Sequence, residues 1–146
     1  ALPILKHRIE FVRDLHGVLY YNDSKATNPD AAIRGIGSMN RKTLLIGGGY
    51  DKNLEFDAWI ESFDGKVKCL LLIGQTKDKI AVCARKHGFE NIVCCDTLNE
   101  AVNICYRLAK PGEAVLLSPA CASWGDFKDY TQRGELFRQY VMELPE

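Results

Sequence analysis

Three short segments of the sequence concentrate hydroxyl groups, ammonium groups and open backbone. The first, Asp23 to Asn28, places an acid, two hydroxyls and a cation just before a proline. Turn and helix-capping chemistry explains Asn28, Pro29 and Asp23. It does not explain Lys25, because a cation near the positive end of a helix is unfavourable unless an anion lies there too. The segment therefore indicates either capping alone or an anion site.

The second segment follows an apolar run that ends at Ile46. It contains three consecutive glycines, Gly47 to Gly49, and then Lys52. Glycines let backbone N–H groups approach a ligand, and a lysine beside them can hold an anion. The spacing matches neither a P-loop nor the dinucleotide-binding Gly-x-Gly-x-x-Gly pattern. Taken alone, the segment fits a plain turn as well as a binding loop.

The third segment, Leu117 to Trp124, is built from small residues and includes the hydroxyls of Ser118 and Ser123. It lacks Gly-x-Ser-x-Gly, and none of the three histidines lies at an obviously paired position. A hydrolase with a serine or Cys121 nucleophile is therefore disfavoured. If the three segments meet, their cations, hydroxyls and backbone donors predict a receptor for a small anion, either a carboxylate or a phosphate.

Each segment follows a predicted β-strand. Near-continuous apolar runs, typical of strands covered on both faces, predict strands over residues 43–46, 67–73, 91–94 and 114–117. Residues 8–22 are predicted to form a β-hairpin around His16 and Gly17. Capping and stop signals predict helices that start at Asn28, span 56–63, run from Thr76 to Gly88, start at Thr97, and run from Phe127 to about Met142.

Strands that alternate with helices predict an α/β fold. We expect a Rossmann-like, open, mostly parallel sheet of about six strands, with one antiparallel strand from the N-terminal hairpin and helices on both faces. Ligands bind such sheets beyond the carboxyl ends of the strands. The chain of 146 residues has no linker or low-complexity tract, so residues 1–146 are predicted to be one domain. Its start, residues 1–5, lacks a signal-peptide pattern and is typical of the cut edge of a longer protein.

Charge and composition exclude several classes of function. Lysine plus arginine and aspartate plus glutamate both number 19, so the net charge is zero and nothing draws the chain to nucleic acid or to anionic lipid. The apolar runs are strand length, so no membrane span is predicted. The six cysteines have no Cys-x-x-Cys spacing and lie mostly in apolar patterns. This favours reduced thiols in the cytoplasm and predicts no metal site.

In these segments the sequence resembles the Mur ligases, which add amino acids to peptidoglycan precursors. The resemblance covers almost the whole chain and is greatest to the members that add D-glutamate to UDP-N-acetylmuramoyl-L-alanine. Its most specific element is Asp-Ser-Lys-Ala-Thr-Asn at residues 23–28. The other matching elements are Gly-Gly-x-x-x-Lys ending at Lys52, Leu-Ser-Pro-Ala-Cys-Ala-Ser at residues 117–123, Phe127, Tyr130, Arg133-Gly134 and His7-Arg8.

The resemblance implies that this chain is the C-terminal, amino-acid-accepting domain of a three-domain ligase, without the UDP-binding domain and the central ATPase domain. The implied reaction forms ADP: ATP with Mg²⁺ converts the alanyl carboxylate to an acyl phosphate, which the D-glutamate amine attacks. It serves cytoplasmic peptidoglycan synthesis and thereby cell shape and division. We expect no catalytic residue, metal ligand or tightly bound cofactor in this domain, and no activity of the domain alone.

The family's binding residues map onto this sequence as two sets. The predicted contacts to D-glutamate are Thr27, Lys52, Ser123, Trp124, Tyr130 and Lys25. The predicted contacts to ATP are Arg8, Asp23 and His7. The sequence departs from the family pattern at Gly125, where an acid is common, and has Asp126 one place later.

Two other interpretations of the sequence remain open. A free-standing Rossmann-like module could bind a nucleotide or small anion without chemistry, and it explains the fold and size but not the three segments together. A folate-polyglutamate ligase shares the implied architecture and chemistry, but it is not expected to carry Asp-Ser-Lys-Ala-Thr-Asn.

Overall fold

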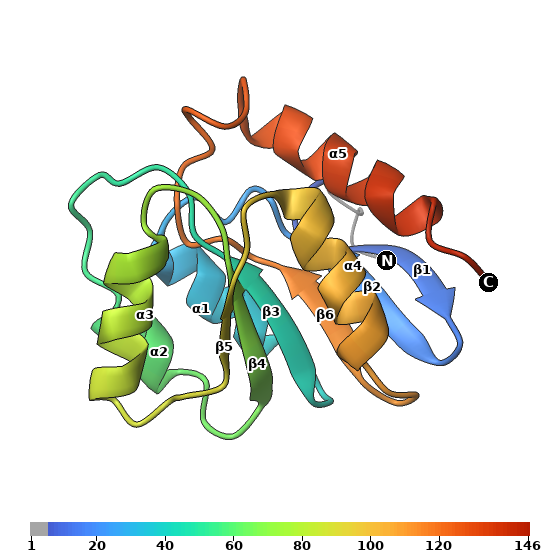
Figure 1. The fold of residues 1–146 in the computed structure, drawn as a ribbon, viewed down its shortest axis with the longest axis horizontal. Helices are drawn as coiled ribbons and strands as arrows, with labels where there is room; N and C mark the ends of the chain where they lie inside the picture. Colours follow the sequence, from blue (N-terminus) through green and yellow to red (C-terminus); the bar gives the residue numbers. More distant parts are fainter. Residues whose placement is uncertain (1–5) are drawn as a thin grey trace.

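A computed structural model describes residues 6–146 as a six-stranded sheet with helices on both faces (Figure 1). The strand order is β1-β2-β6-β3-β4-β5; β1 runs antiparallel to β2, and every other neighbouring pair is parallel. The strands are β1 (Glu10–Leu15), β2 (Val18–Asn22), β3 (Thr43–Gly47), β4 (Val67–Leu72), β5 (Ile92–Cys94) and β6 (Ala114–Leu117). The helices are α1 (Pro29–Gly37), α2 (Asp57–Glu61), α3 (Lys77–Lys86), α4 (Leu98–Leu108) and α5 (Tyr130–Met142). The predicted fold class is confirmed, whereas the predicted cut edge at residues 1–5 lies outside the described residues.

The predicted hairpin turns at His16 and Gly17, as expected. Both residues have positive φ, 55° and 84°, which suits a two-residue turn whose twist matches that of the flanking strands. The first strand lies within the predicted hairpin and runs from Glu10 to Leu15. Its register shifts between Phe11 and Arg13. A bulge at this point breaks the alternation of side chains along the strand.

Side-chain caps begin α1 and α4 where the sequence predicts them. The Asn28 side-chain oxygen accepts a hydrogen bond from the Ala31 N–H at 3.0 Å, and Pro29 occupies the first turn. The Thr97 hydroxyl accepts one from the Glu100 N–H, also at 3.0 Å. Each cap satisfies a backbone donor that a helix start leaves without a partner.

The predicted start of the last helix, at Phe127, is wrong. Instead, α5 begins at Tyr130, because the Asp129 carboxylate caps it by accepting a hydrogen bond from the Gln132 N–H at 2.8 Å. The Phe127 N–H turns back to the carbonyl of Ser123 at 3.0 Å. Residues 118–129 therefore form a long loop, which leaves more chain at the edge of the sheet than the sequence indicated.

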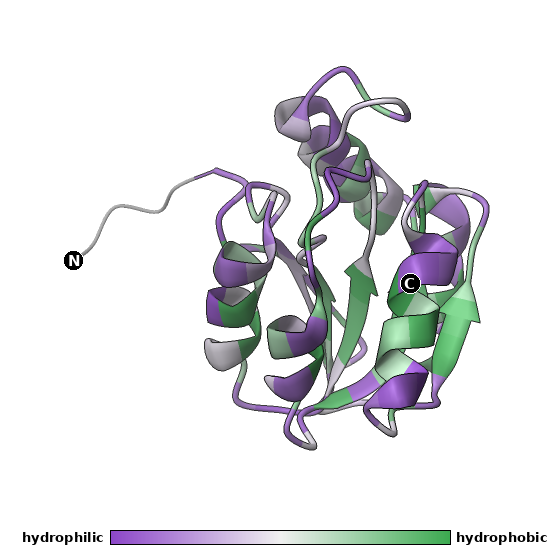
Figure 2. Ribbon diagram, turned by 90° about the vertical axis from the view of Figure 1, so that its left-hand side faces the viewer, coloured by the Kyte–Doolittle hydropathy of each residue, from purple (hydrophilic) through white to green (hydrophobic). Residues whose placement is uncertain are grey.

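The sheet has a helical layer and an apolar core on each face. Alternate residues of the central strands point to opposite sides, so Leu45 and Leu116 pack under α1, α2 and α3, while Leu44 and Val115 pack under α4 and α5. Figure 2 shows apolar strands between helices that carry polar stretches. In the described part of the chain, the longest helix has 13 residues, and no helix is long and apolar enough to cross a membrane.

Candidate functional site

The three chemically unusual segments lie side by side at one edge of the sheet. Because β6 lies between β2 and β3 and all three are parallel, their carboxyl ends meet there. We call the segments that follow them the first loop (residues 23–28), the glycine loop (residues 48–56) and the serine loop (residues 118–129). Backbone hydrogen bonds join them: the Asp23 N–H donates to the Leu117 carbonyl at 2.7 Å, and the Gly48 N–H donates to the Pro119 carbonyl at 2.9 Å. The predicted convergence is confirmed.

The glycine and serine loops together hold an exposed lysine against an exposed tryptophan. The Tyr50 N–H donates to the Ala122 carbonyl at 2.9 Å, and the Tyr50 ring packs edge-on against Trp124 with 5.5 Å between centroids. The Lys52 ammonium lies 4.3 Å from the Trp124 ring centroid, within cation–π range. Ser123, 4% exposed, directly precedes Trp124. Two predicted D-glutamate residues, Lys52 and Trp124, are thus brought together, and Ser123 is the buried neighbour of Trp124 in the chain.

Two glycines have structural reasons for their positions in these loops. Gly48 has φ 98°, and a Cβ there would overlap the carbonyl of Ile73, so this position excludes any side chain. Gly125 has φ 95° in the serine loop. The glycine that departs from the family pattern therefore occupies a left-handed turn, and Asp126 supplies an exposed acid one residue later.

The remaining predicted D-glutamate residues group around the first loop and the start of α5. The Ser24 hydroxyl donates to the Tyr130 carbonyl at 2.7 Å. The Lys25 ammonium lies 6.0 Å from the Tyr130 ring centroid. Thr27 is half-buried, and its N–H donates to the Lys25 carbonyl at 2.9 Å. The six predicted residues therefore form two groups, one on the glycine and serine loops and one on the first loop and the start of α5.

A fully buried arginine that the sequence reasoning left without a role links these two groups. Arg133 of α5 donates from Nε to the Ser24 hydroxyl at 2.9 Å and from a terminal nitrogen to the Ser24 carbonyl at 2.7 Å. The other terminal nitrogen donates to the Cys121 carbonyl at 3.0 Å. Burial lowers the pKa of Arg133 to about 10, so the guanidinium stays charged at neutral pH. One side chain thus fixes the first loop to the serine loop.

Three cations line a surface pocket of about 310 Å³ beside the first loop. They are Arg8 and Lys25, which sequence reasoning had singled out, and Arg34 of α1, which it missed. The only signal for Arg34 in the sequence is its place on the helix that the first loop begins. Because Lys25 lines this pocket and also lies near Tyr130, it stands between the predicted nucleotide residues and the predicted D-glutamate residues.

The carboxylate of Asp23 is engaged by the protein itself. It accepts hydrogen bonds from the Ser118 hydroxyl at 2.8 Å and from the Ile9 N–H at 3.2 Å. Burial raises the pKa of Asp23 to about 6, against the opposing effect of those two donors. Asp23 lines the cationic pocket, but the residue is 3% exposed and its carboxylate is held by these two donors, so its contact with ATP stays a prediction.

His7 is also buried and joins the N-terminal segment to α5. The Asn22 amide oxygen accepts the Ser24 N–H at 3.1 Å, so the amide nitrogen faces the ring and donates to His7 Nδ1 at 2.8 Å. The other ring nitrogen, Nε2, lies 3.4 Å from a Glu135 carboxylate oxygen. A Cβ at Gly134 would overlap the ring. Of the three predicted ATP residues, only Arg8 is exposed.

The buried Asp23 predicts an unusual pH dependence of stability. Its pKa is about 6 in the folded protein and 3.8 ordinarily, so between these pH values the folded state binds more protons and stability falls as pH rises. Asp23→Asn is expected to remove this loss, which amounts to about 2 kcal/mol between pH 4 and pH 6.5. Urea unfolding at pH 4 and pH 6.5 measures it, with the exposed Asp126→Asn as control. Equal pH dependence in Asp23→Asn and the wild type would contradict the assignment.

Comparison with known proteins identifies the family. The family described as "Mur ligase, glutamate ligase domain" matches residues 7–121, most of the chain. The chain belongs to the Mur ligases. It is 59% identical over 140 residues to the UDP-N-acetylmuramoylalanine--D-glutamate ligase of Lachnoclostridium phytofermentans and 55% identical to that of Lachnospira eligens. Each alignment covers 96% of this chain and 31% of the ligase, so the chain spans about a third of the length of these relatives.

Solved structures of a murein peptide ligase and of a folylpolyglutamate synthase share the fold. A murein peptide ligase of Psychrobacter arcticus superimposes with a TM-score of 0.63 at 15% identity, over 97% of this chain and 31% of that one. The folylpolyglutamate synthase of Mycobacterium tuberculosis, solved with ADP, gives 0.65 at 13% identity, over 98% and 34%. At such low identity the likeness concerns the fold alone. The family predicted from the three motifs is confirmed by the sequence match.

Proposed function

We propose that this chain is the D-glutamate-accepting, C-terminal domain of an ATP-dependent ligase that joins D-glutamate to UDP-N-acetylmuramoyl-L-alanine. The observation that carries the proposal is the Lys52 ammonium held over Trp124, beside Ser123 in the chain, where the loops of three parallel strands meet. The curated relatives named for this reaction support it. The UDP-binding and ATPase functions belong to parts of the ligase outside residues 1–146, and the whole enzyme works in the cytoplasm.

The chemistry of D-glutamate fits the site. The amino acid brings two carboxylates that must be held and one amine that must stay unprotonated and aimed at its target. The Lys52 ammonium binds one carboxylate through a charge-assisted hydrogen bond, and the hydroxyls of Thr27 and Ser123 donate further hydrogen bonds. Trp124 holds the ammonium in place through its ring. The domain's contribution to the rate is orientation: it presents the amine to the activated alanyl carboxylate.

The pocket lined by Arg8, Lys25 and Arg34 fits the phosphates of ATP, since three cations face one cavity. When bound, ATP supplies the phosphoryl group that activates the alanyl carboxylate. Among the described residues that line this pocket, Asp23 is the one that carries a carboxylate. Its oxygens already accept hydrogen bonds from the Ser118 hydroxyl and the Ile9 N–H. The pocket does not fit Mg²⁺, so we assign the ligands of that ion to the ATPase domain.

A free-standing module that binds a small anion without chemistry is not favoured. The curated relatives are ligases about three times the length of this chain, and the match to them extends through all three loops.

The isolated 146-residue chain is expected to form no ADP or phosphate from ATP and UDP-N-acetylmuramoyl-L-alanine, with or without D-glutamate, because it has no P-loop. A coupled assay for ADP release measures this, with the full-length ligase as the positive control. ATP turnover by the isolated chain would overturn the assignment to a single accepting domain.

A further inference from the structure

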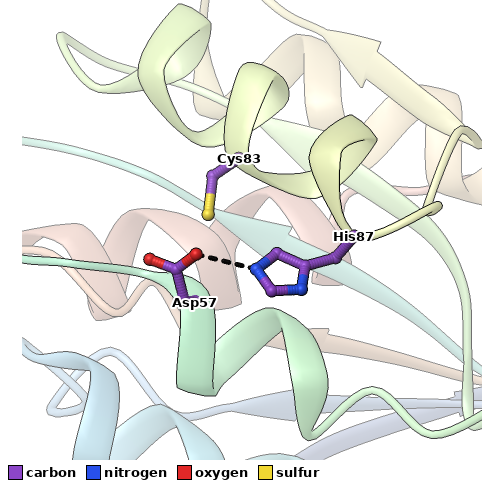
Figure 3. Close-up of side chains that lie close together, drawn as sticks. All are labelled: Asp57, Cys83 and His87. Atoms are coloured by element: carbon purple, nitrogen blue, oxygen red, sulfur yellow. Dashed lines mark hydrogen bonds and ion pairs between the residues drawn. The ribbon is translucent and has the colours of Figure 1, made fainter.

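Away from the three loops, three side chains with metal-binding atoms meet between α2 and α3 (Figure 3). Asp57 is the first residue of α2, while Cys83 and His87 come from α3 and its C-terminal cap. A carboxylate oxygen, the Cys83 sulfur and a His87 ring nitrogen all lie within 4.8 Å of one another. The cysteine and the histidine are four residues apart, so they occupy the same face of one helix on successive turns.

We propose that Asp57, Cys83 and His87 bind a Zn²⁺ ion that joins α2 to α3. Sulfur, imidazole nitrogen and carboxylate oxygen are the three donor types that Zn²⁺ takes in proteins, whereas Ca²⁺ and Mg²⁺ prefer oxygen alone. Three protein ligands leave the fourth tetrahedral position to water. The site lies on the helical layer, outside the described D-glutamate and ATP contacts, so its role is to fix the packing of two short helices.

The surroundings of His87 suit a metal ligand. In the metal-free protein, Nε2 carries a proton and donates to the Asp57 carboxylate at 2.7 Å. The other ring nitrogen, Nδ1, lies 3.7 Å from a carboxylate oxygen of Glu61. When Zn²⁺ binds Nε2, the ring proton is carried by Nδ1, and Glu61 accepts its hydrogen bond. A carboxylate behind a ligating histidine is the usual arrangement at zinc sites, where it fixes the orientation of the ring.

The charges around the cluster also favour a cation. Asp57 and Glu61 are both acidic, and His87 lies at the C-terminal end of α3, where the helix dipole is negative. The opposing group is Lys86, whose ammonium lies 3.9 Å from Asp57 and is exposed enough to turn away. Burial and the nearby Asp57 raise the pKa of the Cys83 thiol, so binding releases the thiol proton to solvent as the sulfur–zinc bond forms.

The alternative is that the cluster is only an ion pair between Asp57 and a protonated His87. Titrating the chain with Co²⁺ and then displacing the Co²⁺ with Zn²⁺ distinguishes a metal site from an ion pair. We expect one Co²⁺ per chain, with a thiolate-to-cobalt charge-transfer band that Zn²⁺ removes. Cys83→Ser is expected to abolish the band, and Glu61→Gln to weaken Co²⁺ binding about tenfold. The matched control is Cys94→Ser, which changes an exposed thiol on β5 and should leave the band intact.

Folding is checked by thermal unfolding without metal, and His87→Gln provides a second ligand variant if Cys83→Ser does not fold. Zn²⁺ is expected to raise the melting temperature of the wild type and of Cys94→Ser, but not that of His87→Gln. The proposal is overturned if the wild type shows no thiolate-to-cobalt band, if the band survives Cys83→Ser, or if it disappears in Cys94→Ser.

Discussion

Replacing Lys52 with alanine in the full-length ligase is expected to lower kcat/KM for D-glutamate by about 30-fold to 1000-fold. This corresponds to a loss of about 2 to 4 kcal/mol of transition-state binding, the usual cost of removing one partner of a charge-assisted hydrogen bond. The structure gives the reason: Lys52 is exposed, held over Trp124, and extends from the loop that the serine loop supports. No neutral side chain at this position would hold a carboxylate equally well.

The matched control for Lys52 is Lys42, an exposed lysine at the opposite end of the same strand β3, whose ammonium donates to the Gly65 carbonyl at 2.9 Å. Lys42→Ala is expected to leave D-glutamate kinetics unchanged. Steady-state rates with D-glutamate varied at saturating ATP measure both variants. A Lys52→Ala enzyme with wild-type kcat/KM for D-glutamate would remove Lys52 from the site.

The second large effect concerns stability. Arg133→Met keeps most of the side-chain volume but removes the donors to the buried carbonyls of Ser24 and Cys121, while the Ser24 hydroxyl keeps its hydrogen bond to the Tyr130 carbonyl. Each orphaned acceptor costs about 1 to 3 kcal/mol, and we expect a total loss of about 3 to 5 kcal/mol in the free energy of unfolding. For a domain of this size the melting temperature should fall by about 10 °C or more.

Calorimetry or urea unfolding of the chain measures the effect of Arg133→Met. The control is Arg138→Met on the same helix, where a partly exposed arginine pairs with Glu10 at 3.2 Å and is expected to contribute less than about 1 kcal/mol. If Arg133→Met unfolds within about 1 kcal/mol of the wild type, the guanidinium does not hold the loops together.

The fold could be predicted from the sequence wherever a single segment carried its own signal. The apolar runs at β3, β4 and β6 are buried on both faces, and the caps at Asn28 and Thr97 depend on residues only three positions away. The sequence predicts the start of α5 near Phe127, whereas the structure caps the helix at Asp129. Strand order follows from long-range pairing, which no local pattern encodes.

The meeting of the three loops was predictable from the strands that precede them, but the groups that hold the loops together were not. Arg133 contacts Ser24, 109 residues away, and nothing near it in the sequence marks it as buried. The hydrogen bond that holds the Asp23 carboxylate likewise depends on Ser118, 95 residues later. Asp57 and His87 are 30 residues apart, which is why no metal site was predicted. In each case the partner is brought in by tertiary packing.

The most direct test of the proposed division of this domain is steady-state kinetics of the full-length ligase with D-glutamate and ATP varied separately, comparing Thr27→Ala with Arg8→Ala. Thr27 lies on the first loop after β2, whereas Arg8 lines the cationic pocket. We expect Thr27→Ala to weaken D-glutamate use by about 1 to 3 kcal/mol, as for a lost hydrogen bond to a charged group, and to leave KM for ATP unchanged. Arg8→Ala should instead lower kcat and ATP use. A Thr27→Ala enzyme impaired only toward ATP would contradict the account, because it would place the nucleotide in the pocket assigned to D-glutamate.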